Sequence, residues 1–84
     1  MNKTYTIPFS EGLHARPASQ FVQLVQDFDG HVQIDKEGKR INGKSVIHIM
    51  TLGAKKGDQL TIALTGEETA EAELFARLDD FFSA

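Results

Sequence analysis

The sequence predicts a two-layer α+β sandwich whose elements follow the order β-α-β-β-α-β-α. Four short segments alternate apolar with polar residues, which is typical of strands. Other segments repeat apolar residues every three or four positions, which is typical of amphipathic helices. The chain has only 84 residues, which allows one small core, and strands interspersed with helices favour a two-layer arrangement.

The first strand and the first helix are joined by a predicted turn at residues 10–12. Tyr5, Ile7 and Phe9 recur with period two, and Pro8, which has no N–H to donate, places the strand end nearby. Asp29 and Gly30 are predicted to end the helix that follows. The apolar stripe of this helix consists of Ala18, Phe21, Val22, Val25 and Phe28.

Residues 31–42 are predicted to form an antiparallel hairpin with a turn at 36–39, and Gly43 breaks its second strand. A fourth strand follows the turn at 55–58, and a last helix begins with an acidic turn that suits the helix dipole. The strand positions expected inside are Val32, Ile34, Leu60, Ile62 and Leu64. The stripe of the last helix is Leu74, Phe75, Leu78, Phe81 and Phe82.

Residues 45–52 are ambiguous between strand and helix. Their β-branched residues favour a strand, whereas Ser45 is a good N-cap and Gly53 a good residue to follow a helix. We choose a short helix with Ile49 and Leu52 toward the core. A second apolar side then points elsewhere: Val46, Ile47 and Met50.

Composition excludes several classes of function. Net charge is −3 and no basic stripe is present, which argues against nucleic acid as a partner. The chain has no cysteine, no signal sequence and no apolar run long enough for membrane insertion, so a cytoplasmic protein is expected. We expect residues 1–84 to form one domain and a monomer. Their length and the initial Met1 favour a freestanding protein over a domain cut from a larger one, an alternative that the sequence leaves open.

The stretch GLHARPAS, from Gly12 to Ser19, carries the candidate chemistry. Pro17 suits the first turn of a helix, which places His14 at about the N-cap and Arg16 inside that turn. Free backbone N–H groups and the positive end of the helix dipole make such a place an anion site, and phosphate is its usual ligand. The guanidinium of Arg16 can also bind phosphate oxygens.

A neutral imidazole nitrogen of His14 can attack phosphorus and form a phosphohistidine. The spacing alone leaves a second interpretation open, in which His14 replaces an N-cap residue and Arg16 is only a surface charge. A metal site is not expected, because His14, His31 and His48 lie on different elements without ligand spacing. A catalytic triad is not expected either, because no nucleophile elbow surrounds the nearby serines.

Two segments resemble the signatures of one family. GLHARPA resembles the active-site signature of HPr, the histidine-containing phosphocarrier protein of the bacterial phosphoenolpyruvate:sugar phosphotransferase system. GKSVIHIMTLG, from Gly43 to Gly53, resembles the signature around the regulatory serine of that family. The resemblance extends over the whole chain and implies an open-faced β-sandwich, with four antiparallel strands and three helices on one face.

The resemblance also implies a function for the first signature. His14 matches the histidine that accepts a phosphoryl group, through Nδ1, from phospho-enzyme I and donates it to IIA domains of sugar permeases. Arg16 matches the arginine that steadies this group, and Ala15 and Pro17 complete the helix start. Such a protein is a carrier rather than an enzyme that turns over a small molecule, and no cofactor is expected.

The second signature implies regulation and docking. Ser45 matches the serine modified by HPr kinase/phosphorylase, which implies that kinase and a catabolite-control transcription regulator as further partners. Enzyme I and the IIA domains would dock on an exposed patch beside the histidine, formed by Val46, Ile47, His48 and Met50. The alternative is an HPr-like regulatory paralogue that acts as a signalling and interaction module.

Overall fold

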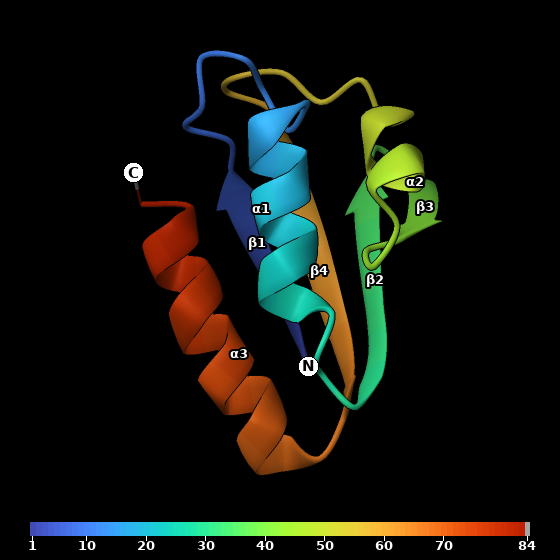
Figure 1. Ribbon diagram of the computed structural model, residues 1–84, viewed down its shortest axis with the longest axis vertical. Coiled ribbons are helices and arrows are strands. Elements are labelled where there is room, and N and C mark those ends of the chain that lie inside the picture. Colours follow the sequence, from blue (N-terminus) through green and yellow to red (C-terminus); the bar gives the residue numbers. More distant parts are fainter. Residues whose placement is uncertain (84) are drawn as a thin grey trace.

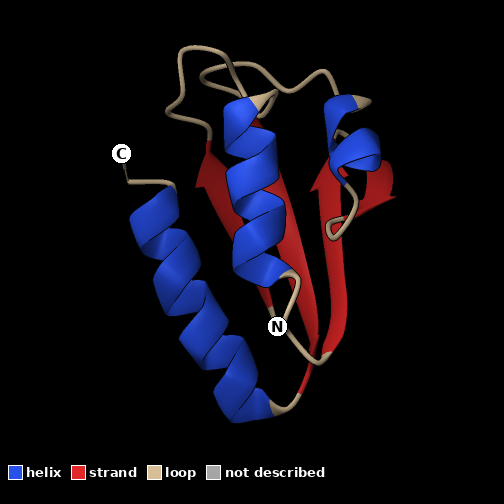
Figure 2. Ribbon diagram, in the orientation of Figure 1, coloured by secondary structure: helices blue, strands red, loops and turns tan. Residues whose placement is uncertain are grey.

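The computed structural model describes residues 1–83 and has the predicted order of elements. The strands are β1 (Asn2–Thr6), β2 (Gly30–Lys36), β3 (Lys39–Asn42) and β4 (Gln59–Gly66). The helices are α1 (Arg16–Val25), α2 (Val46–Met50) and α3 (Glu68–Phe81). The strands pair antiparallel in the order β1-β4-β2-β3, and the helices lie on one face of the sheet (Figures 1 and 2). The open-faced β-sandwich is therefore confirmed.

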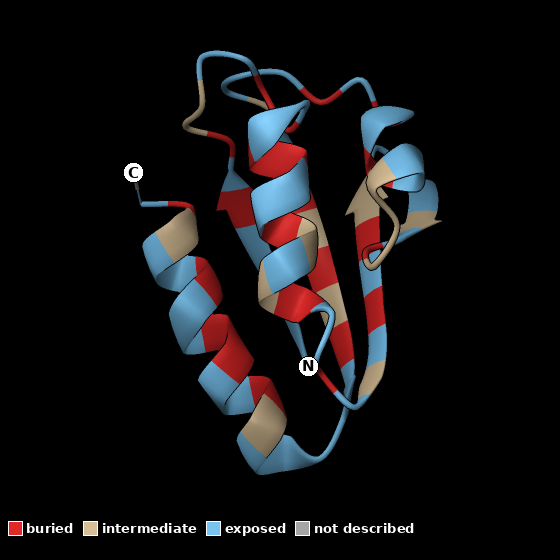
Figure 3. Cartoon of the chain, in the orientation of Figure 1, coloured by how far each residue is buried: buried red, intermediate tan, exposed pale blue. Residues whose placement is uncertain are grey.

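The core lies between the sheet and the helices. Leu60, Ile62 and Leu64 of β4 are each at most 1% exposed, because alternate residues of a strand point to the same face. Phe21 of α1 and Leu78 of α3 are fully buried against this face. Figure 3 shows buried and exposed positions alternating around both helices, as their stripes predict.

The other face of the sheet has no helical cover and is polar. Thr4 of β1 lies opposite Thr61 of β4, and their hydroxyl oxygens are 3.1 Å apart. Thr61 in turn lies opposite Asp35 of β2, whose carboxylate accepts a 3.1 Å hydrogen bond from Nε of Arg40 in β3. Polar contacts on this face therefore join β1 to β4 and β2 to β3.

Two predicted helix ends were wrong. α1 ends at Val25 rather than near Asp29, because the N–H of Phe28 turns back to the carbonyl of Val25 at 3.0 Å. Phe28 is nevertheless buried, which explains why it extended the apolar pattern. α2 ends at Met50, and Leu52 reaches the core from the turn that follows.

The first strand also ends earlier than its apolar pattern, at Thr6. Pro8 cannot donate to the sheet, and Phe9 packs outside it against Phe81 of α3, with ring centroids 5.0 Å apart. The end of α3 therefore supports the loop that leads to His14.

A polar cluster connects β1 to α3. The hydroxyl of Tyr5 donates a 2.6 Å hydrogen bond to Asp79, and Nζ of Lys3 lies 2.6 Å from the same carboxylate oxygen. The hydrogen bond from Lys3, and next that from Tyr5, lower the pKa of Asp79. Burial, and next the bond to Asp79, raise the pKa of Tyr5. The cluster thus favours an ionised Asp79 and a neutral Tyr5 in the folded state.

Candidate functional site

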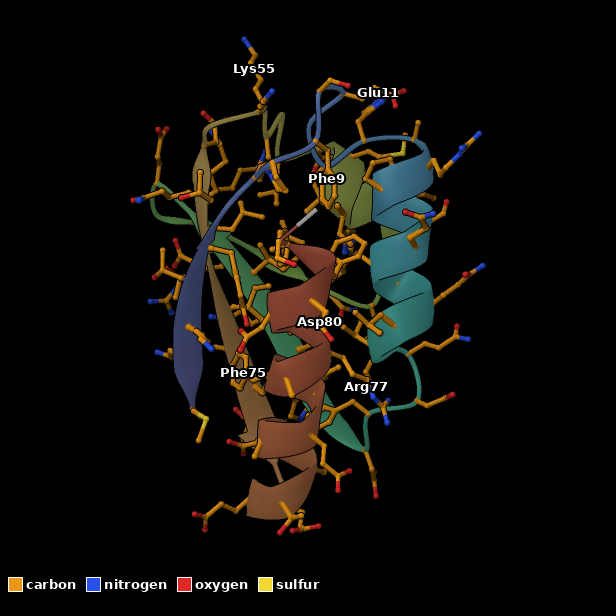
Figure 4. The ribbon with its side chains drawn as sticks, turned by 90° about the vertical axis from the view of Figure 1, so that its left-hand side faces the viewer. Phe9, Glu11, Lys55, Phe75, Arg77 and Asp80 are labelled. Carbon is orange, nitrogen blue, oxygen red and sulfur yellow. The ribbon has the colours of Figure 1, made fainter. Side chains whose placement is uncertain are left out.

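The loop that precedes α1 is held by the loop that precedes β4. The N–H of Ile7 donates to the carbonyl of Asp58 at 2.9 Å, and the N–H of Gly57 donates back to the carbonyl of Ile7 at 2.9 Å. Closer to α1, the N–H of Leu13 donates to the carbonyl of Ala54 at 3.2 Å. Figure 4 shows Glu11 and Lys55, one from each loop, at the same end of the molecule. This pairing of loops fixes the backbone on which His14 is carried.

Gly12 is required where these loops meet. Its φ is +72°, and a Cβ atom there would lie 2.2 Å from the carbonyl oxygen of Ala54. The turn at Gly12 sends the side chain of Leu13 into the core, where it is 1% exposed. The side chain of the next residue, His14, is exposed.

Ala15, and not His14, is the N-cap of α1, which corrects the prediction by one residue. Its φ of 50° and ψ of −118° lie in a region that favours glycine, and its carbonyl accepts the N–H of Ser19 at 3.1 Å. A non-glycine residue in such a conformation costs about 1–3 kcal/mol. The structure therefore holds backbone strain between the two predicted reactive residues, His14 and Arg16.

The start of α1 provides donors for an anion. Arg16 is the first residue of the helix and is exposed, and Pro17 follows it with no N–H of its own and is buried. Among residues 1–83, no acceptor bonds to the backbone N–H of Arg16 or of Ala18, and the first turn has no acidic residue. Both His14 and Arg16 are exposed at this helix start, and free N–H groups at a helix N-terminus are suited to phosphate oxygens.

Ser45 is the N-cap of α2, as predicted. Its hydroxyl accepts the N–H of His48 at 3.3 Å, and its carbonyl accepts the N–H of Ile49 at 3.0 Å. The Ser45 side chain is partly exposed. α2 runs antiparallel to α1 in Figure 1, so the end of α2 lies beside the start of α1.

The four predicted docking residues differ in exposure. Ile47 is 74% exposed and Met50 is 39% exposed, and His48 is also exposed. Val46 instead is only partly exposed and packs against the core, and its part in docking stays a prediction. The reason is geometric: Val46 lies three residues before Ile49, which is fully buried, and residues so spaced share a side of the helix.

Sequence reasoning missed Phe9 and Ala54 as supports of the site, since both act through contacts distant in sequence.

The predicted absence of metal ligands stays a prediction, although residues 1–83 contain no cluster of three histidine, cysteine, aspartate or glutamate residues suited to a metal ion. Within the same range, none of the helices has the length and hydropathy needed to cross a membrane.

Comparison with known proteins decides which family has this arrangement. The family described as PTS HPr component phosphorylation site matches residues 1–84. The chain belongs to the PTS HPr family. HPr proteins are phosphocarriers, and the match includes the segment with His14 and Arg16.

Solved HPr structures have the same fold as this chain over nearly its whole length. The HPr-C-His structure from Thermoanaerobacter tengcongensis is 32% identical, with a TM-score of 0.85 and coverage of 100% of this chain and 97% of that one. The phosphocarrier protein HPr of Bacillus anthracis str. Ames is 37% identical, with a TM-score of 0.79 over 90% of this chain and 93% of that one.

A paralogue of HPr also matches. The catabolite repression protein Crh of Bacillus subtilis is 34% identical, with a TM-score of 0.74 over 92% of this chain and 86% of that one. That structure is described as a dimer with a swapping domain. The chain is therefore similar both to a phosphocarrier protein and to a protein named for catabolite repression.

Proposed function

We propose that this chain accepts a phosphoryl group on His14 from phospho-enzyme I and donates it to IIA domains of sugar permeases. The observation that carries the proposal is the placement of an exposed His14 directly before the strained N-cap Ala15, beside the unbonded N–H groups at the start of α1. Family membership supports the carrier chemistry.

The transfer is a substitution at phosphorus. The lone pair of a neutral imidazole nitrogen of His14 attacks, the new N–P bond forms, and the bond from phosphorus to the donor breaks with its electron pair leaving on the donor. We assign Nδ1 as the attacking atom, with the hydrogen on Nε2. The reverse substitution, with a IIA nucleophile attacking the same phosphorus, discharges the carrier.

Arg16 and the helix start act on the phosphoryl oxygens. The guanidinium of Arg16 neutralises charge on the oxygens as the group moves, while the N–H groups of Arg16 and Ala18 supply donors from the backbone. Ala15 and Pro17 hold this turn. Ala15 is the N-cap, where the chain turns into α1, and Pro17 has no backbone N–H, at a position where such a group has no acceptor within the helix. The group is thus held on His14 by the covalent N–P bond, while these donors stabilise the charge on its oxygens.

Docking of enzyme I and of the IIA domains is proposed on α2. Ile47 and Met50 present apolar surface on α2, and His48 adds an exposed polar group. The end of α2 lies beside the start of α1 (Figure 1). Val46 supports this surface from below rather than contacting a partner. Apolar side chains left exposed on a small protein are typical of an interaction site.

The experiment is to incubate the protein with enzyme I, magnesium and radioactively labelled phosphoenolpyruvate. We expect one acid-labile, base-stable phosphoryl group on the wild type and none on His14→Ala. Arg16→Ala should slow the transfer while leaving the fold intact. Equal labelling of His14→Ala would overturn the proposal.

We further propose that HPr kinase/phosphorylase modifies Ser45. A phosphate at this N-cap would be stabilised by the positive end of α2, yet it would add about two negative charges beside the docking surface and repel acidic partners. Phosphorylation should therefore slow charging by enzyme I, and it would provide a signal to a catabolite-control transcription regulator. Treatment with the kinase should label the wild type but not Ser45→Ala; equal labelling of both would exclude this serine.

The similarity to Crh favours a second candidate, a regulatory paralogue acting mainly through protein interactions. The discriminating measurement is discharge of the phosphorylated protein by purified IIA domains. A carrier loses its phosphoryl group to at least one IIA domain, whereas a regulatory module is charged but not discharged. Light scattering of the purified protein tests the accompanying prediction of a monomer.

A further inference from the structure

A groove separates the end of α1 from the first half of α3, at the opposite end of α1 from His14. We define the α1–α3 groove as a cavity of about 340 Å³ with an apolar floor and a charged rim. The floor is formed by Leu24, Phe28 and Leu74. The rim is formed by Asp27, Asp29, Glu73 and Arg77.

The floor leaves one side chain in particular within reach of a partner. Phe28 is 8% exposed and Leu74 is 4% exposed, so both belong to the core, whereas Leu24 is only partly buried. The floor therefore suits a single apolar anchor rather than an extended hydrophobic surface.

The rim carries excess negative charge. Asp27, Asp29 and Glu73 form no ion pair with any residue in the range 1–83, and neither does Arg77. In Figure 4, Arg77 extends from α3 toward the end of α1, whereas Asp80 lies elsewhere on the same helix. The four rim residues carry a net charge of −2. The Lys44 ammonium, which donates to the carbonyl of Phe28 between Asp27 and Asp29, lowers the local excess to −1, which still favours a cationic ligand.

We propose that the α1–α3 groove binds a segment of a partner protein in which one aliphatic side chain lies between lysine or arginine residues. The aliphatic side chain enters the cavity against Leu24, and the flanking cations pair with the carboxylates of the rim. α1 has ten residues, so the groove lies about 15 Å from the start of that helix. Binding there leaves His14 accessible, and a protein charged on His14 can carry the partner at the same time.

The test is an NMR titration of the isotope-labelled full chain with the peptide GKRLRKG. We expect saturable shifts at residues around the groove and weaker binding as ionic strength rises. Glu73→Lys should weaken binding about five- to tenfold, and Arg77→Gln should strengthen it. Replacing the leucine of the peptide by serine should weaken binding at least about tenfold.

Asp80→Lys is the matched control, because it changes the net charge by the same amount on the same helix but outside the groove. It should leave the affinity unchanged. Equal weakening by Asp80→Lys and Glu73→Lys, or equal binding of the serine peptide, would overturn the proposal in favour of diffuse attraction between opposite charges. Self-association that Glu73→Lys abolishes would also overturn it, with a second copy as the occupant. Enzyme I should phosphorylate Glu73→Lys at the normal rate. A failure of peptide binding can therefore be distinguished from a failure of the proposed carrier function.

Discussion

The backbone N–H of Leu13 donates a 3.2 Å hydrogen bond to the carbonyl oxygen of Ala54, and this contact brings two loops together directly before His14. The same carbonyl would meet any side chain placed at Gly12. The position of the His14 backbone thus depends on a contact between residues about forty positions apart.

Gly12→Ala should therefore disturb both stability and transfer. The variant combines an unfavourable positive φ with a clash against the Ala54 carbonyl, and we expect a loss of about 3 kcal/mol or more in the free energy of unfolding. Gly53→Ala is the control, because its φ is +62° but no atom lies within 4 Å of the added Cβ. It should lose only about 1 kcal/mol. Denaturant unfolding compares the two, and equal losses would show that the clash is relieved at no cost.

Ala15→Gly should stabilise the protein. Glycine adopts a φ of 50° with a ψ of −118° without strain, so we expect a gain of about 1 kcal/mol after the greater entropy of the unfolded glycine chain is included. Stability is measured by thermal unfolding. A destabilised variant would mean that the alanine backbone is not strained as described.

Apolar periodicity was sufficient to predict the four strands and the long helices, because Leu60, Ile62 and Leu64 leave little choice of inner face. The pairing of all four strands in one antiparallel sheet was implied by the family resemblance. The strain at Ala15 could not be predicted, since alanine has no preference for positive φ. The hydrogen bond between Leu13 and Ala54 could not be predicted either, because no local sequence pattern indicates a contact between loops that are distant in sequence. The partial burial of Val46 could not be predicted, because two apolar sides on a short helix do not reveal how the helix is rotated.

Ile47→Asp and Val46→Ala should have opposite consequences. Ile47 is 74% exposed, so its replacement should leave stability within about 0.5 kcal/mol of the wild type while slowing charging by enzyme I about tenfold. Val46→Ala should lose about 1 kcal/mol of stability, because Val46 packs against the core, with little effect on charging. Unfolding and charging rates are measured on both variants. Normal charging of Ile47→Asp would remove Ile47 from the docking surface.

Stability should fall in acid through Asp79 and Glu71. The hydrogen bond from Lys3 lowers the pKa of Asp79 from 3.8, and the hydrogen bond from the N–H of Gly66 lowers the pKa of Glu71 from 4.5. A carboxyl group whose pKa is lowered by folding stabilises the folded state when the pH is above the pKa of that group in the unfolded chain. This contribution to the free energy of unfolding disappears as the pH falls below about 4. Asp79→Asn should unfold more easily at neutral pH and show a shallower loss of stability in acid. An unchanged acid profile would exclude Asp79 as a contributor.

The most direct test of the carrier function is heteronuclear NMR of the three imidazole rings before and after charging with phosphoenolpyruvate and enzyme I. We predict that the ring nitrogens of His14 alone change to the pattern of an Nδ1-phosphorylated imidazole, while those of His31 and His48 are unaffected. Adding a IIA domain should then restore the original spectrum. A phosphoryl group on His31 or His48, or on no histidine at all, would contradict the account.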